Sequence, residues 1–328
     1  MKLAFSGQQS AINNQRLFRG PLTSDYGLRT SDSNALALKA KSSESDKSCL
    51  ISRSPKATFF VLGWVAQRFP SLVKEIHRRG HEIGCHGLNH KVIFQQSRSE
   101  FENDVRRAKE LLEDITGSPV IGYRAPTYSI TKKTLWAFEV LIEMGFLYDS
   151  SIFPIKHDYY GLPSAPRFPF RVFVGPGGEV EFEGVNKRPD ASDPKPAASI
   201  MEFPLTTAIF LGSRVPVAGG GYFRLFPYSV TKFFLKRVNE VEERPFIFYF
   251  HPWEIDPDVP RIDAAGLVSK FRTYVNLGKT KSRVKDLLGE FCFSSLLEHY
   301  RFLSDYRVKQ TKRRSMPFRD DRTLKDSD

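Results

Sequence analysis

Three features are scarce in this 328-residue sequence, and each scarcity excludes a class of protein. No run approaches the roughly 18 consecutive apolar residues of a transmembrane helix, so no transmembrane segment is expected. Residues 1–5 run directly into the polar residues 6–10, which is unlike a secretory signal, so we expect the chain to stay in the cytoplasm. The cysteines are too few and too scattered for a disulfide framework or a CxxC zinc site: Cys49, Cys85 and Cys292.

Basic residues are concentrated at the two ends of the chain. The net charge is +12, and residues 1–56 carry 9 Lys/Arg against 4 Asp/Glu while residues 301–328 carry 9 against 5. The 244 residues between them therefore hold only +3. Such ends are typical of solvated flanks that an anionic lipid or polymer surface attracts, and the rest has no basic stripe for nucleic acid. We expect no nucleic-acid partner.

Apolar segments of strand length alternate with helix-like segments from Ala57 onward. Hydrophobic residues make up 41% of the chain, which is enough for a sizeable core. Nearly continuous apolar strands separated by helices predict a parallel α/β sheet, either open or closed as a barrel. The strands are expected at 57–62, 81–85, 120–123, 146–148 and 246–250, and the helices at 70–79, from the capping box Ser97–Glu100 to Gly117, and at 131–144.

The middle of the chain departs from this alternation. Arg171–Val174 and Glu179–Phe182 flank Gly175-Pro176-Gly177-Gly178, which predicts an inserted β-hairpin. Residues 188–199 are rich in proline and alanine and are expected to form a loop. Residues 219–224 contain three consecutive glycines, which favours a tight turn over a loop that lets the backbone approach a ligand.

Polar side chains stand at the carboxyl ends of four predicted strands. His86, Arg124, Asp149 and His251 each follow a different strand, and active sites of parallel α/β folds are built at this edge. His86 and His90 also form an HxxxH pair, a spacing that can supply two ligands to one divalent ion. Each residue alone also fits a structural role: an ion pair for Arg124, a turn cap for Asp149 and a buried strand end for His251.

These motifs, in this order, resemble the polysaccharide deacetylase family with its NodB-homology domain. The resemblance rests on His86 and His90, on Arg124-Ala125-Pro126, on Asp149 and on the apolar segment before His251, and it covers about residues 57–253. The segments 248–256 and 274–278 look like the exosortase-associated branch, whose members accompany exopolysaccharide synthesis. The resemblance implies a distorted parallel (β/α) barrel, here with an inserted hairpin and an incomplete or replaced first β-α unit.

The resemblance also implies a metal-dependent amide hydrolysis. His86 and His90 match the histidine ligands of a divalent metal, most often zinc, with cobalt or nickel as alternatives. Arg124 matches the arginine that orients the catalytic base, and His251 matches the histidine that protonates the departing amine. Asp149 matches the carboxylate that pairs with this histidine. The backbone N–H of Thr127 would help to hold the oxyanion, and Trp253 would contact the acetyl group or the sugar ring.

The acidic pair that opens the family's site, supplying the base and a third metal ligand, is missing upstream of Ala57. We therefore divide the chain into a non-matching, poorly ordered segment 1–56, a deacetylase-like barrel 57–300 and a basic tail 301–328. The leading hypothesis is removal of acetyl groups from N-acetylated sugars of an exopolysaccharide, impaired by this loss. The alternative is a non-catalytic polysaccharide-binding or assembly protein. Either would associate peripherally with an exopolysaccharide assembly system at the inner membrane.

Overall fold

The computed structural model describes residues 54–157, 160–185, 198–261 and 266–304. Almost all of the expected N-terminal segment 1–56 and of the basic tail 301–328 lies outside these ranges. Residues 1–53, where the first acidic motif is expected and missing, also lie outside them, so the structure does not test that expectation.

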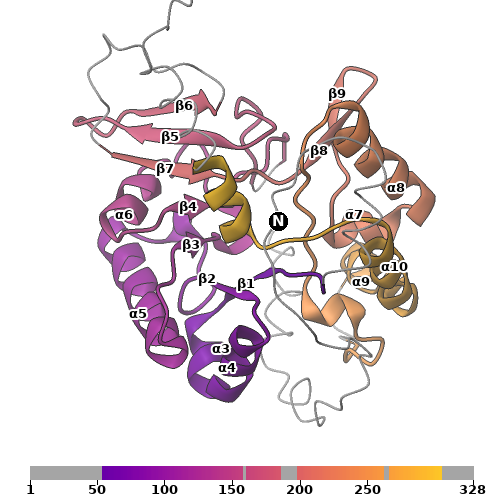
Figure 1. Ribbon diagram of the computed structural model, residues 1–328, viewed down its shortest axis with the longest axis horizontal. Helices are drawn as coiled ribbons and strands as arrows, with labels where there is room; N and C mark the ends of the chain where they lie inside the picture. The colour runs from indigo at the N-terminus through magenta and orange to yellow at the C-terminus, as the bar shows by residue number, and fades with distance from the viewer. Residues whose placement is uncertain (1–53, 158–159, 186–197, 262–265, 305–328) are drawn as a thin grey trace, which may run out of the picture.

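A seven-stranded sheet with the order β1-β2-β3-β4-β7-β5-β6 forms the centre of the protein (Figure 1). Strands β1 to β4 and β7 run parallel, and β5 is antiparallel to both β7 and β6. This confirms the predicted α/β class with a mostly parallel sheet, as in a distorted barrel, and confirms the inserted hairpin. The strands are β1 Thr58–Val61, β2 Glu82–Cys85, β3 Gly122–Tyr123, β4 Tyr148–Asp149, β5 Phe170–Val174, β6 Val180–Gly184 and β7 Ala198–Glu202.

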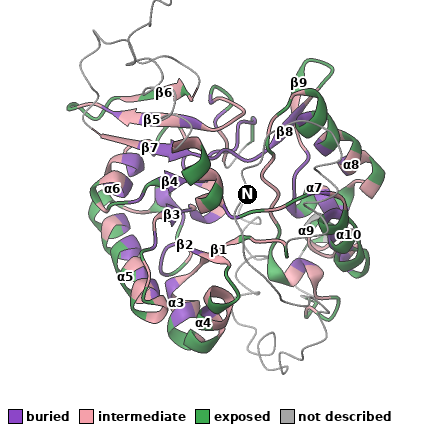
Figure 2. Cartoon of the chain, viewed as in Figure 1, coloured by how far each residue is buried: buried purple, intermediate pink, exposed green. Residues whose placement is uncertain are grey.

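Helices fill the connections between β1, β2, β3 and β4 and cover one face of the sheet (Figure 1). Their apolar side chains and those of the strands form the largest core cluster, which includes Phe101, Leu112, Tyr123 and Phe138. Figure 2 shows the central strands mostly buried and the outer sides of α4 and α5 exposed. The elements are α3 Gly63–Arg68, α4 Pro70–Arg78, α5 Arg98–Thr116 and α6 Ala137–Glu143, with the short 3-10 helices η1 Ile93–Gln95 and η2 Pro126–Tyr128.

Helix α5 begins and ends where its sequence predicts. The Ser97 hydroxyl accepts from the Glu100 N–H at 3.3 Å, and the Glu100 carboxylate accepts from the Ser97 N–H at 2.8 Å. This reciprocal capping box satisfies two N–H groups that the first turn leaves without helical partners. At the other end Gly117 adopts φ +64°, a left-handed conformation that glycine takes without a Cβ clash.

The remaining elements lie on the other side of the sheet (Figure 1). A second core cluster joins the β8–β9 hairpin to α8 and α10 through residues such as Ala208, Leu235 and Leu287. The elements are β8 Thr207–Phe210, β9 Ser213–Pro216, α7 Gly220–Leu225, α8 Tyr228–Lys236, the π-helical η3 Arg237–Val241, η4 Pro252–Ile255, α9 Leu267–Tyr274 and α10 Leu277–Glu290. A last helix, over residues 296–304, packs instead on Tyr148 of β4 and Met201 of β7.

The predicted strand at 246–250 is wrong. The segment makes only one isolated bridge, between Tyr249 and Gly219, and another of its N–H groups, that of Ile247, donates to the Thr206 hydroxyl at 2.6 Å. This aromatic-rich segment therefore does not join the sheet, because its hydrogen bonds go to Gly219 and Thr206, which lie outside the strands.

Three further expectations need correction. The turn expected at 219–224 is the start of α7, which incorporates Gly220 and Gly221. Gly219 is needed there because it adopts φ +119° and a Cβ would lie 1.9 Å from the Tyr249 carbonyl oxygen. The helix expected at 131–144 is regular only in α6, because residues 131–136 form turns. Ala198 and Ser199, expected in a loop, start β7, whereas residues 188–197 lie outside the description.

The helix at 296–304 closes the amino ends of the strands. The Leu296 N–H donates to the Thr58 hydroxyl at 2.8 Å, and the Leu297 N–H donates to the Glu82 carboxylate at 2.9 Å. Tyr300 packs on a cluster that includes buried Tyr148. The opposite, carboxyl ends of the strands are therefore the edge where a site can form. Within the described ranges, none of the helices has both the length and the apolar character needed to cross a membrane.

Candidate active site

His86 and Arg124 stand side by side at the carboxyl ends of neighbouring parallel strands. The His86 N–H donates to the Val61 carbonyl at 3.1 Å and the Arg124 N–H donates to the Cys85 carbonyl at 3.0 Å, so both continue the ladder beyond the strands. Asp149 is the last residue of β4, the next strand in the sheet. The sheet thus brings three of the predicted residues to one edge.

His86 is held in one orientation and one tautomer. Its Nδ1 lies 2.6 Å from the Arg124 carbonyl oxygen. A carbonyl only accepts, so Nδ1 carries the proton and the Nε2 lone pair is left for another partner. Burial, reinforced by the charges of His90, Arg124 and His251, lowers the pKa of His86 to about 3. The ring is therefore neutral at physiological pH.

His90 lies against His86, with ring centroids 5.2 Å apart and an interplanar angle of 74°. Burial first, and then the charge of His251, lowers the pKa of His90. The loop between the two histidines is anchored by Asp104 of α5, whose carboxylate accepts the Leu88 N–H at 2.7 Å. The HxxxH spacing therefore yields two adjacent, neutral imidazoles.

His251 approaches this pair from a distant part of the chain. Its ring centroid lies 6.0 Å from that of Tyr249, which lies 5.3 Å from that of Tyr128, and the Arg124 guanidinium lies 6.0 Å from the Tyr128 ring. The charge of His251 also contributes to the lowered pKa values of His86 and His90. Its side chain is 48% exposed and stacks with Trp253, with ring centroids 6.0 Å apart and an angle of 19°. His251 and Trp253 therefore lie together.

The carboxylate beside His251 belongs to Glu254, not to Asp149. The Glu254 Oε2 lies 3.2 Å from the His251 Nδ1 and accepts the His251 backbone N–H at 2.7 Å. Burial opposes ionisation, but the hydrogen bonds and charge of His251 and the charge of Arg224 outweigh it and lower the pKa of Glu254. The sequence spacing His251-Pro-x-Glu254 could have indicated this contact, because it places a carboxylate acceptor three residues after the N-cap residue His251.

Asp149 is completely buried and makes other contacts, so the pairing expected with His251 is corrected. Its carboxylate accepts the Ser151 hydroxyl at 2.6 Å and N–H at 3.1 Å. It also shares a hydrogen bond with Glu202, its neighbour on β7. Burial and then the charge of Asp149 raise the pKa of Glu202 well above its ordinary value, so Glu202 is the protonated donor. No sequence pattern indicated this pair.

Arg124 is fixed by the turn that follows Asp149. Its Nε donates to the Ser150 carbonyl at 2.9 Å and its Nη2 donates to the Ser150 hydroxyl at 2.7 Å. The guanidinium also lies 4.4 Å from the centroid of the Phe60 ring. Ser151 completes the link, since its hydroxyl accepts the Ala125 N–H at 2.7 Å. Asp149 therefore supports the backbone next to Arg124 through Ser151, whereas Ser150 holds the Arg124 side chain directly.

Thr127 follows the Arg-Ala-Pro triplet with φ +54°, inside η2. A positive φ is rare for a β-branched residue, and such strain is found most often at functional sites. The conformation turns the backbone of Thr127 sharply at the carboxyl edge of the sheet, next to Arg124.

The histidine pair fits one part of a metal site. Two neutral imidazoles, one with its Nδ1 occupied by a carbonyl, are suitable ligands for zinc, cobalt or nickel. Among the described residues, however, no group of three His, Cys, Asp or Glu side chains is arranged to hold a metal ion. His86 and His90 therefore stand as two candidate ligands and not as a complete set.

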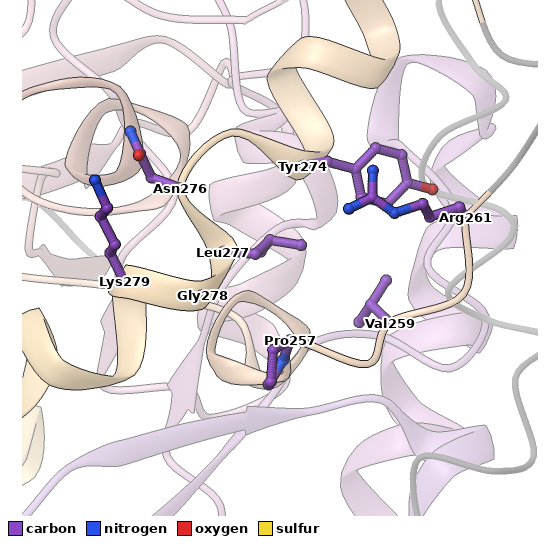
Figure 3. A pocket seen from close by; sticks show the side chains of 8 residues that line it. All are labelled: Pro257, Val259, Arg261, Tyr274, Asn276, Leu277, Gly278 and Lys279. Carbon is purple, nitrogen blue, oxygen red and sulfur yellow. The ribbon is translucent and has the colours of Figure 1, made fainter.

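A cavity of about 360 Å³ lies between the segment after η4 and the start of α10 (Figure 3). None of the predicted site residues lines it. Its lining is Pro257, Val259, Arg261, Tyr274, Asn276, Leu277, Gly278 and Lys279.

Comparison with known proteins divides the chain into two parts. Residues 48–145 match the polysaccharide deacetylase family. Residues 150–301 match a domain of unknown function (DUF3473). The deacetylase match contains His86, His90 and Arg124, whereas the second match contains His251, Trp253 and Glu254. Both parts thus contribute to the candidate site.

Individual relatives agree with the deacetylase match. The chain is 39% identical to a peptidoglycan-N-acetylglucosamine deacetylase of Bacillus cereus over 71 residues, 22% of this chain and 33% of that protein. It is 33% identical to a peptidoglycan deacetylase of Helicobacter pylori over 96 residues, 29% of this chain and 32% of that protein. The chain thus spans about a third of the length of these curated relatives. A solved structure from Mycobacterium smegmatis, described as a candidate polysaccharide deacetylase, covers 79% of this chain and 76% of its own at 17% identity, with a TM-score of 0.47.

Proposed function

We propose that the chain is a metal-dependent hydrolase that removes acetyl groups from N-acetylated sugars of an exopolysaccharide. The observation that carries the proposal is the meeting of two neutral histidines with a third histidine that an ionised carboxylate supports. The deacetylase match over 48–145 supports the reaction class. The exopolysaccharide, the exosortase-associated branch and the peripheral association with an assembly system rest on the resemblance of 248–256 and 274–278.

In this proposal His86 and His90 hold the divalent ion, with zinc preferred over cobalt or nickel. A bound divalent ion would polarise the acetamide carbonyl and lower the pKa of a water molecule at the site. The neutrality of both rings favours this role because a protonated imidazole cannot donate a lone pair.

His251 is the general acid of the proposed reaction. As the C–N bond of the acetamide breaks, the Nε2 proton of charged His251 passes to the amine nitrogen, while the Nδ1 proton stays on the imidazole and remains hydrogen-bonded to ionised Glu254. Arg124, fixed by Ser150, presents positive charge at the same edge, and the backbone N–H of Thr127 donates to the oxyanion. The half-buried Trp253 ring, stacked on His251, offers an apolar face to the sugar ring.

A binding protein without catalysis is the second candidate. The absence of a three-ligand group among the described residues favours it. Such a protein would bind N-acetylated oligosaccharides at the same edge of the sheet without releasing acetate.

Acetate release from N-acetylated oligosaccharides, with zinc or cobalt added, separates the two candidates. We expect turnover in the parent protein and a loss of at least about 100-fold in His86→Ala, because one of the two described ligands disappears. His77→Ala is the matched control, since His77 lies on α4 and its ring forms a hydrogen bond with Ser118 at 3.3 Å. Saccharide binding with no acetate in the parent would overturn the hydrolase proposal and support the binder.

A further inference from the structure

Glu254 lies between His251 and Arg224, and each of its two carboxylate oxygens faces one of them. We propose that Glu254 and Arg224 are positioning residues that fix the tautomer and direction of His251, and that the α9–α10 junction in the domain of unknown function holds Arg224 in place. The catalytic part of this inference rests on the proposed function, whereas the part about the tautomer does not.

The contacts of Glu254 determine which nitrogen of His251 carries a proton. Oε2 accepts the His251 backbone N–H at 2.7 Å and lies 3.2 Å from Nδ1, and Oε1 accepts the Arg224 Nε–H at 2.9 Å. The Glu254 side chain is 2% exposed, so water does not compete for these oxygens. An ionised carboxylate only accepts, so Nδ1 of His251 must donate. Its Nε2 is then the nitrogen available to a substrate.

Arg224 is itself fixed by several groups. Its side chain is 4% exposed, its Nη1 donates to the Thr273 carbonyl at 2.6 Å, and its guanidinium lies 4.9 Å from the centroid of the Trp253 ring. A buried arginine whose donors are divided between a carboxylate and a carbonyl has little freedom to move. Arg224 therefore orients Glu254, and through it His251.

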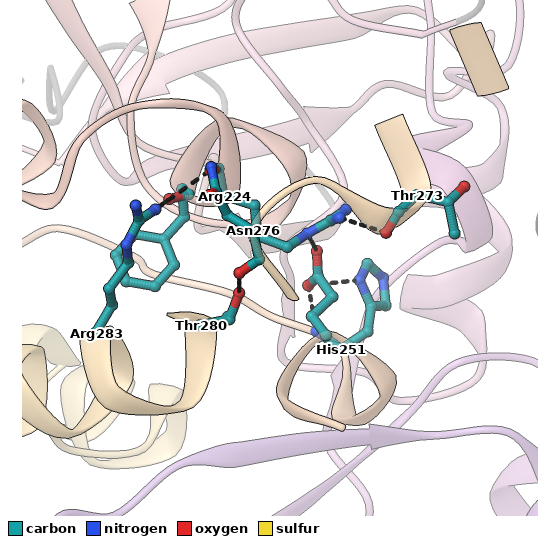
Figure 4. A network of polar contacts seen from close by, with 8 residues as sticks. Arg224, His251, Thr273, Asn276, Thr280 and Arg283 are labelled. Atoms are coloured by element: carbon teal, nitrogen blue, oxygen red, sulfur yellow. Dashed lines mark hydrogen bonds and ion pairs between the residues drawn. The ribbon is translucent and has the colours of Figure 1, made fainter. Parts of the chain in front are cut away.

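The α9–α10 junction completes this chain of contacts. The Asn276 side chain donates to the Arg224 carbonyl at 2.8 Å, and Arg283 Nη1 donates to the same carbonyl at 3.2 Å (Figure 4). Arg283 Nη1 also donates to the Phe223 and Phe226 carbonyls, both at 3.1 Å, and so fixes the end of α7. The second matched domain thus supplies both the acid and its support.

The charges around His251 make such support necessary. On one side lie His86 and His90, whose protonation it disfavours, and behind Glu254 lies the permanent charge of Arg224. Glu254 is the carboxylate in contact with the imidazole. Without it, a buried arginine would be left without its anion.

The test is ¹⁵N NMR of the histidine rings in the parent protein, with His251 assigned by comparison with His251→Asn. We expect the neutral form of His251 to carry its proton on Nδ1. In Glu254→Gln we expect the amide oxygen to stay on the charged guanidinium of Arg224, although this turns the NH₂ toward the His251 backbone N–H. Nδ1 of His251 then loses its acceptor, and the proton of the neutral ring moves to Nε2. Acetate release should fall about 10- to 100-fold in kcat with KM changed less than about twofold.

Glu242→Gln is the matched control, because Glu242 forms a similar ion pair with Arg167, at 2.8 Å, that does not touch a histidine. It should leave the His251 signals and kcat unchanged. A neutral parent His251 protonated on Nε2 overturns the proposal, even if Glu254→Gln fails to fold. So does a folded Glu254→Gln whose tautomer and kcat match those of the parent. A parent that shows the expected tautomer but releases no acetate instead refutes the proposed function and leaves the positioning intact.

Discussion

At the scale of single residues, burial and hydrogen bonding decide what each side chain of the site can do. His86 and His251 are both histidines, yet a carbonyl partner and burial keep the first neutral, whereas Nδ1 of the second faces the carboxylate of Glu254. The sequence predicted both residues at the carboxyl ends of sheet strands; His86 does follow β2, whereas the segment before His251 joins no strand of the described sheet. It did not predict Glu254 as the partner of His251, because that contact depends on the local turn of η4 and on Arg224, which is 30 positions away.

The buried carboxyl pair of Asp149 and Glu202 predicts a pH dependence of stability. In an unfolded chain Glu titrates near pH 4.3. Burial raises the pKa of Glu202 in the folded protein, so this group favours folding fully below the unfolded pKa, and that contribution is lost as the pH rises through the folded pKa. Glu202→Gln should flatten this decline, which can reach about 1.4 kcal/mol per pH unit for one proton.

Urea unfolding between pH 4 and pH 9 measures this slope. Exposed Glu181 on β6, changed to Gln, is the control and should follow the parent curve. An unchanged slope in Glu202→Gln would show that the pair is not linked to folding.

At the scale of elements, local sequence signals predict the helices and strands of the parallel part of the sheet more accurately than those of the rest of the chain. The apolar strands, the Ser97 cap and Gly117 specify β1, β2 and α5 within a residue or two, because each signal acts over one turn or one pleat. The segment 246–250 shows the limit of this reasoning. Its composition is that of a strand, but only tertiary neighbours decide whether an extended segment pairs with another strand in a sheet.

The cap of α5 gives a second stability prediction. Ser97→Ala removes the hydroxyl that accepts the Glu100 N–H and should lower the free energy of unfolding by about 1 kcal/mol. Chemical denaturation of the two proteins measures the difference. Ser71→Ala is a suitable control, since Ser71 lies in the first turn of α4, where no side chain forms a cap. Equal losses in both variants would refute the role of the capping box.

At the scale of the whole molecule, the site exists only because two matched regions meet. The deacetylase match brings the histidine pair and Arg124 to the edge of the sheet, and the domain of unknown function brings His251 with its own supporting network. Sequence reasoning could predict the first set from strand order alone. It could not predict how the second half folds back onto the sheet, because contacts such as Arg224 with Thr273 follow no local period.

The central claim is that His86 and His90 bind one divalent ion beside His251. The most direct test is a cobalt titration followed by visible absorption of the bound ion. We predict saturable binding in the parent protein and in His251→Asn, with loss in His86→Ala and in His90→Ala. Binding that survives in both of these alanine variants, or no binding in the parent, would contradict the account.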